Sequence, residues 1–91
     1  MQIDVRHNPA HSRFEATVEG QLSMAVYRLE DRVMAIVHTE VPRPLERRGI
    51  ASALAAAALA HAREHGYKVD PRCAFVRGYM QRHPETQSLH V

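Results

Sequence analysis

A short run of residues at the predicted start of a helix has the composition of a phosphate-binding site. It reads Arg47, Arg48, Gly49, Ile50, Ala51 and Ser52. The first N–H groups of a helix have no partner within it, and this end carries roughly half a positive charge, so it attracts phosphate oxygens. Glycine lets a ligand approach the backbone, and arginine binds phosphate bidentately. The run predicts a seat for a diphosphate; alternatively, Gly49 only relieves crowding at a turn and the arginines are solvated.

One histidine and the single cysteine are candidate reactive groups. His38 lies on a predicted strand three residues before Val41, and a histidine with an ordinary pKa of ~6.5 can take up a proton at neutral pH. Cys73 stands at the predicted start of a helix beside Arg72, a setting that favours the thiolate. The alternatives are a structural histidine bonded to nearby backbone and a small buried cysteine.

The other histidines and the arginines do not predict a metal or nucleic-acid site. His61 and His65 are four residues apart, as in zinc sites, but no Glu or Cys stands at a spacing that completes the set. The arginines Arg72, Arg77 and Arg82 recur every five residues, which scatters them around a helix. The formal charge is only +2. We therefore expect neither a metal cofactor nor a nucleic-acid partner.

Length and composition favour one compact domain in the cytoplasm. The 91 residues are 45% hydrophobic and 24% charged, as in ordinary globular domains. The alanine-rich uncharged stretch 49–61 is shorter than the roughly 20 residues that span a bilayer, and residues 1–6 do not resemble an export signal. A single cysteine excludes an internal disulfide, which fits a reducing cytosol. The oligomeric state stays open.

The predicted elements are four strands, a helix, a strand and a second helix. Apolar alternation or apolar runs mark the strands, alanine-rich composition followed by Gly66 marks the first helix, and apolar spacings of three and four mark the second. The strands are 2–6 (a run broken by Asn8 and Pro9), 13–19, 22–29, 33–41 and 67–70, and the helices are 49–65 and 73–82. This order predicts an α/β (α+β) fold, an antiparallel meander followed by a crossover helix and a parallel strand. The polar residues 85–91 predict a loosely packed tail.

The segment 41–51 resembles a known cofactor signature. Val41 and Pro42, then Glu46, Arg47, Arg48, Gly49, Ile50 and Ala51, are similar to the acetyl-coenzyme A signature of the GNAT superfamily of N-acetyltransferases, in which Gln or Arg is followed by two residues, Gly, one residue, and Gly or Ala. The resemblance covers about 33–82 and is strongest to short, single-domain GNAT-like proteins. Glu46 departs from the signature, and Arg47 stands where a second glycine is common. A carboxylate near a diphosphate weakens binding unless Arg47 or Arg48 engages it.

The resemblance implies one GNAT-like domain over 1–91 that binds acetyl-coenzyme A. Residues 47–52 would seat the diphosphate, and the strand residues His38, Thr39, Glu40 and Val41 would hold the pantetheine arm. Splaying of this strand from the one near 67–70 would make the acyl slot. Only 8–12 separate the first two strands, so two helices of longer relatives are missing, and the acceptor side would be open or completed by another chain.

The implied reaction is acetyl transfer from the thioester to an unidentified amine. Such a transfer needs a deprotonated amine and a stabilised leaving thiolate. His38 is the candidate base, and Cys73 either carries the acyl group transiently or lines the pocket, as short GNAT-like relatives have a cysteine at a similar place. Tyr79 could protonate the thiolate, as a tyrosine does in many GNAT enzymes, or pack in the core. The alternative function is a coenzyme-binding module without turnover.

Overall fold

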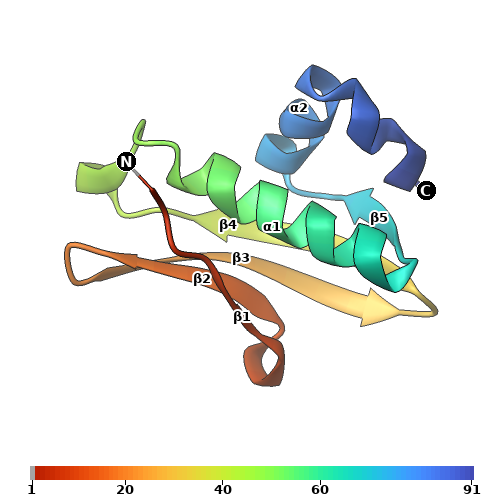
Figure 1. The fold of residues 1–91 in the computed structure, drawn as a ribbon. Helices are drawn as coiled ribbons and strands as arrows, with labels where there is room; N and C mark the ends of the chain where they lie inside the picture. Colours follow the sequence, from red (N-terminus) through yellow and green to blue (C-terminus); the bar gives the residue numbers. More distant parts are fainter. Residues whose placement is uncertain (1) are drawn as a thin grey trace.

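Five strands form one mixed sheet in the computed structural model, which describes residues 2–91 (Figure 1). In spatial order they are β1 (Arg6–Asn8), β2 (Arg13–Val18), β3 (Gln21–Glu30), β4 (Val33–Glu40) and β5 (Lys68–Pro71). Neighbours from β1 to β4 are antiparallel, and β5 is parallel to β4. A parallel return needs a long crossover, which α1 (Ile50–His65) supplies. The predicted order of meander, helix, strand and helix is confirmed.

Both α-helices lie on the same face of the sheet (Figure 1). Helix α1 runs along the sheet, and α2 (Ala74–Arg82), followed by the 3-10 helix η3 (Pro84–Leu89), lies beside it near β5. Alanines of α1 that face inward are fully buried: Ala55, Ala58 and Ala62. Leu59 lies nearly opposite the main apolar stripe in the sequence, yet it is buried too, because Tyr79 and Leu89 come against that side of α1. We call the sheet surface without an α-helix the open face.

A β-bulge in β4 changes which residues face the helices. Tyr27 pairs with Ile36 and Val26 pairs with His38, so Val37 is the extra residue. An extra residue shifts the alternation of side chains by one. Thr39 therefore faces the helices, as does its buried partner Ala25. His38 turns to the open face, where its Nε2 lies 3.3 Å from Oε1 of Glu40.

The first strand lies further along the chain than predicted. Ile3 and Val5, whose alternation predicted it, pack against the core without joining the sheet ladder. The short 3-10 helix η1 (Pro9–His11) directly follows β1, and the Asn8 side chain caps it. Because this turn is short, Asn8 must pair with Arg13. The pairing then continues through His7 to Arg6, which pairs with Glu15. Turn geometry thus sets the register rather than apolar alternation.

The carboxyl-terminal residues are packed, which corrects the expectation of a loose tail over 85–91. Thr86 and Leu89 are each only 7% exposed. The N–H of Val91 donates to the carbonyl of Val69 at 3.1 Å. Leu89 packs here because the side of α1 around Leu59 would otherwise leave apolar surface in water.

Candidate functional site

A cleft of about 500 Å³ opens where β4, the following loop and the start of α1 meet. It is lined by Thr39, Glu40, Val41, Leu45, Glu46, Arg47, Gly49, Ile50, Ala51, Ser52 and Phe75. Pairing between β4 and β5 ends at Ile36 and Pro71, since proline has no N–H to continue a ladder. The N–H of Cys73 makes a last bond to the Ile36 carbonyl at 2.9 Å. Beyond it the two segments part, and Phe75 of α2 lines the cleft together with residues of β4.

The amino-terminal end of α1 opens into this cleft without a cap. Gly49 is the N-cap residue with φ of 83°, a left-handed conformation that favours glycine. Its carbonyl accepts the first helical bond, from the N–H of Ala53 at 3.0 Å. No side chain caps the helix, and among residues 2–91 no acceptor is bonded to the N–H groups of Ile50, Ala51 or Ser52. These three amides are free to bind a ligand's oxygens.

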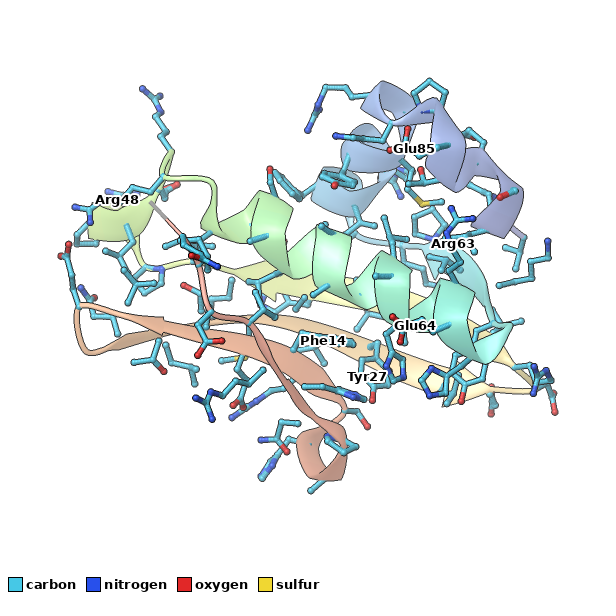
Figure 2. The ribbon with its side chains drawn as sticks, in the orientation of Figure 1. Phe14, Tyr27, Arg48, Arg63, Glu64 and Glu85 are labelled. Carbon is cyan, nitrogen blue, oxygen red and sulfur yellow. The ribbon has the colours of Figure 1, made fainter. Side chains whose placement is uncertain are left out.

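The two arginines before Gly49 take different directions. Arg47 lines the cleft and has φ of 68°, a left-handed conformation that glycine adopts more readily than arginine. Arg48 instead forms an ion pair with Glu19, at the turn between β2 and β3 (Figure 2). Glu46 lines the cleft, and within the described chain no hydrogen bond joins it to either arginine. The cleft is thus lined by one arginine, two acidic residues (Glu40 and Glu46) and the positive end of α1.

Cys73, the N-cap residue of α2, lies next to the cleft and is not one of the residues that line it. Its Sγ is 3.3 Å from Oγ1 of Thr39, which lines the cleft. Partial burial raises the pKa of the Cys73 thiol, but hydrogen bonds from the Thr39 hydroxyl and from backbone groups of Val76, Phe75 and Thr39 outweigh it, so the pKa lies below its ordinary value. At a given pH, a larger fraction of Cys73 is therefore thiolate than of an isolated cysteine.

Three predicted residues lie elsewhere. The His38 side chain is on the open face and 57% exposed, because the bulge at Val37 turns it away from the cleft. Arg48 is held by Glu19. Tyr79 lines a smaller depression between α1 and η3, and its ring stacks on His83 with centroids 3.9 Å apart. The other predicted cofactor residues, namely Thr39, Glu40, Val41, Arg47, Gly49, Ile50, Ala51 and Ser52, all line the cleft.

Two lining residues were not singled out from the sequence as site residues. Leu45 is fully buried at the end of the 3-10 helix η2 (Arg43–Leu45) and forms the floor. Phe75 contributes a wall from α2, whereas its spacing to Tyr79 pointed to the core. Its place two residues after Cys73 is the one signal that could have found it.

Neither a metal site nor a membrane-spanning helix is present in the described part of the chain. Residues 2–91 contain no group of three or more His, Cys, Asp or Glu side chains arranged to hold a metal ion. No helix within the same residues combines the length and the apolar composition needed to cross a bilayer.

Comparison with known proteins assigns the chain to a family. Residues 13–89 match the family described as GCN5-related N-acetyl-transferase. The chain belongs to the GCN5-related N-acetyltransferase family. It is 33% identical over 90 residues to Protein NATD1 of Gallus gallus and of Mus musculus, with 96% of this chain and 82% of each relative covered. Protein NATD1 of Homo sapiens is also 33% identical, with 96% and 80% covered.

A solved structure has the same fold. The NMR solution structure of a GCN5-like protein from Staphylococcus aureus, titled as an N-acetyltransferase of unproven activity, superposes with a TM-score of 0.76. The match covers 97% of this chain and 87% of that one at 22% identity. The GCN5-related fold of a mixed sheet with a crossover helix is therefore shared by both proteins.

Proposed function

We propose that the protein binds acetyl-coenzyme A in the cleft and transfers the acetyl group to an amine. The uncapped amino-terminal end of α1 carries this proposal. Three free amides, the helix dipole and Arg47 converge there on one opening, which is the donor arrangement that a diphosphate requires. Membership of the GCN5-related family supports acetyl-coenzyme A as the ligand.

The rest of the cleft suits the extended arm of the coenzyme. The edge of β4 beyond Ile36 has no partner in β5, so its backbone groups can pair with the amides of pantetheine, as extended ligands add to a sheet edge. Thr39 and Val41 line this edge, and Phe75 faces them. An arm lying along this edge would bring its thioester toward Thr39 and Cys73.

Cys73 is the residue we assign to the chemistry. Its thiolate would attack the thioester carbonyl, forming a new thioester and releasing the coenzyme thiolate, which takes up a proton. The neutral amine acceptor would then attack the cysteine thioester, form an amide, return the Cys73 thiolate and lose to solvent one proton, which balances the proton taken up by the coenzyme. His38 contributes only its backbone in this scheme, because its side chain lies on the open face.

Calorimetric titration tests the binding step. We expect saturable heat with acetyl-coenzyme A and weaker binding of an acetylated pantetheine that lacks the diphosphate. No heat and no thermal shift at millimolar acetyl-coenzyme A would overturn the proposal. Equal affinity for both compounds would show that the amino-terminal end of α1 does not bind the diphosphate.

The catalytic step is tested separately with Cys73→Ala. Coenzyme release with an active amine should stop, while the affinity for acetyl-coenzyme A stays nearly constant. A mass increase of one acetyl group on the unsubstituted protein, absent from Cys73→Ala, would identify the intermediate. Unchanged turnover of Cys73→Ala would assign the thiol to packing alone.

A second candidate is a coenzyme-binding module without turnover. Glu46 in the cleft favours it, as does the single short turn η1 between β1 and β2, which leaves little structure to shape an acceptor site. A panel of amines, assayed for thiol release, separates the two functions. Binding with no release above the uncatalysed rate on every amine would favour the module.

The proposal extends to the setting in which the protein works. We place the chain in the cytoplasm as a single GNAT-like domain, where its free Cys73 stays reduced. Its partners would be acetyl-coenzyme A and an amine acceptor, either a small molecule or a protein.

A further inference from the structure

Three imidazoles and three aromatic rings join β1 to the carboxyl-terminal end of α1. We call this group, made of His7, Phe14, Tyr27, His61, His65 and Tyr67, the histidine cluster. His7 stacks on Phe14 with ring centroids 4.3 Å apart, and it meets His61 edge-on at 4.5 Å. His61 stacks on His65 at 4.0 Å. The cluster lies at the end of α1 opposite to the cleft, under the last turns of the helix (Figure 2).

His7 links β1 to the core side of the sheet. β1 is an edge strand of three residues, paired only with β2. From β1, the ring of His7 reaches the core side of the sheet, where its Nε2 lies 2.7 Å from the hydroxyl of Tyr27. Since so short a strand forms few ladder bonds, these ring contacts add to what holds it in place.

Protonation of His7 and His61 is unfavourable in the folded chain. Burial, followed by the nearby His65, lowers the pKa of His7 below 6.5. Burial, His65 and His7 lower the pKa of His61 in the same way, and they outweigh Glu64, which raises it. Two charged imidazoles with centroids 4.5 Å apart would repel each other strongly in this partly buried place.

The surrounding groups do not neutralise that repulsion. On α1, Glu64 and the helix dipole favour a cation. At the turn after β3, Arg32 adds a positive charge: it donates to the carbonyl of His65 at 2.9 Å, with its guanidinium carbon 5.5 Å from the centre of the Tyr67 ring.

The remaining neighbours supply no counter-charge. On β3, burial raises the pKa of Tyr27, so its phenol stays neutral, and β2 contributes only the uncharged Phe14. Arg63 and Lys68 point to the carbonyls of Glu85 and Ser88 on η3. Glu64 is therefore the one carboxylate acting on the cluster among the described residues.

We propose that the histidine cluster is an acid-sensitive clasp for β1. With neutral imidazoles, His7 holds β1 against Tyr27 and His61. When His7 and His61 are both protonated at low pH, the clasp opens and β1 leaves the sheet. The opened form exposes the edge of β2, a row of unpaired N–H and C=O groups that can bind another strand.

The direction of the pH effect follows from proton linkage. The opened state holds histidines with ordinary pKa values near 6.5, whereas the closed state lowers them. The opened state therefore binds protons first as the pH falls. The clasp's stability is fully present above about pH 6.5 and is lost as the pH drops from there toward the lowered values.

Hydrogen–deuterium exchange of the whole protein tests the clasp. Amide exchange over 5–8 is measured between pH 7.5 and 5.5, corrected for the intrinsic pH dependence, and compared with exchange in β3. We expect the corrected exchange over 5–8 to rise several-fold on acidification while β3 changes little. The double variant His7→Gln, His61→Gln should lose this rise. The control His90→Gln, at an exposed histidine beside β5 and outside the cluster, should keep it.

Several results would overturn the proposal. One is a rise in the corrected exchange over 5–8 that persists unchanged in the double variant. Another is an equal rise in exchange in β1 and β3 on acidification. Should the double variant not fold, an NMR titration of the imidazoles in the unsubstituted protein decides instead. Ring pKa values below 6.5 for both His7 and His61 support the clasp, and values at or above 6.5 refute it.

Discussion

The two ends of α1 have a similar backbone conformation but differ in how their polar groups are hydrogen-bonded. Each end has a glycine in the left-handed conformation, Gly49 with φ of 83° and Gly66 with φ of 70°. At Gly66 the polar groups of the helix end find partners within the chain. The N–H groups of Gly66 and Tyr67 donate to carbonyls of the last turn, and Arg32 donates to the carbonyls of His65 and Gly66. At Gly49 the first amides have no side-chain cap.

Under the proposed function, this difference separates a structural end of α1 from a ligand-binding end. A closed helix end contributes to stability because its polar groups are paired. An open end gives up that stabilisation and keeps its donors for a ligand. Substitutions at the amino-terminal end should therefore change coenzyme affinity, and matched substitutions at the carboxyl-terminal end should change stability alone.

Gly49→Val should have the largest effect on binding. The affinity for acetyl-coenzyme A should fall at least about tenfold, because a branched side chain is strained at this positive φ and would stand beside the free amides. A Cβ at this position meets no atom within 4 Å, so the chain should still fold, with a loss of about 1–2 kcal/mol. Calorimetry and thermal denaturation measure both quantities. Unchanged affinity would exclude the helix end from the binding site.

Gly66→Ala is the matched change at the other end. A Cβ there would lie 2.8 Å from the guanidinium of Arg32 and is strained at this φ. We expect a loss of about 1–2 kcal/mol of unfolding free energy, or a fall in Tm of about 4–8 °C per kcal/mol. Affinity for acetyl-coenzyme A should not change. A fall in affinity like that of Gly49→Val would show that the two ends are coupled.

Arg47→Gly should weaken binding without loss of stability. It removes the arginine that lines the cleft, and each charge-assisted contact to phosphate is worth roughly a three- to tenfold change in affinity. It also relieves the positive φ, so stability should stay within about 1 kcal/mol. The control is Arg63→Gln near the other end of α1, whose partner is the Glu85 carbonyl (Figure 2). A similar loss of affinity in the control would point to net charge rather than to the site.

Glu46→Gln should have the smallest effect, with the opposite sign. Removing this exposed carboxylate from the cleft should raise affinity about twofold, because a screened surface charge contributes only a few tenths of a kcal/mol. Glu64→Gln, the matched change at the carboxyl-terminal end, should leave affinity constant. Titrations at low and high salt measure both. Weaker binding by Glu46→Gln would mean that Glu46 contacts the ligand through hydrogen bonds.

Local features of the sequence determined the helix, its ends and most of the residues that line the cleft. Eight alanines and two flanking glycines fix α1 through propensity and backbone freedom alone. The prolines at 42 and 44 end β4, and Gly49 sets the open helix start. Such preferences act within a few residues, so they can be read along the chain.

Pairing between distant segments decided the rest. The bulge at Val37 depends on how β3 lines up with β4, and it turned Thr39 toward the cleft and His38 away from it. Arg48 left the cleft because the turn holding Glu19 came beside it. His7 and His61 are in contact only because α1 packs on β2 and β3, and β1 pairs with β2. Register and packing set these contacts, and neither is encoded in the spacing of residues within one segment.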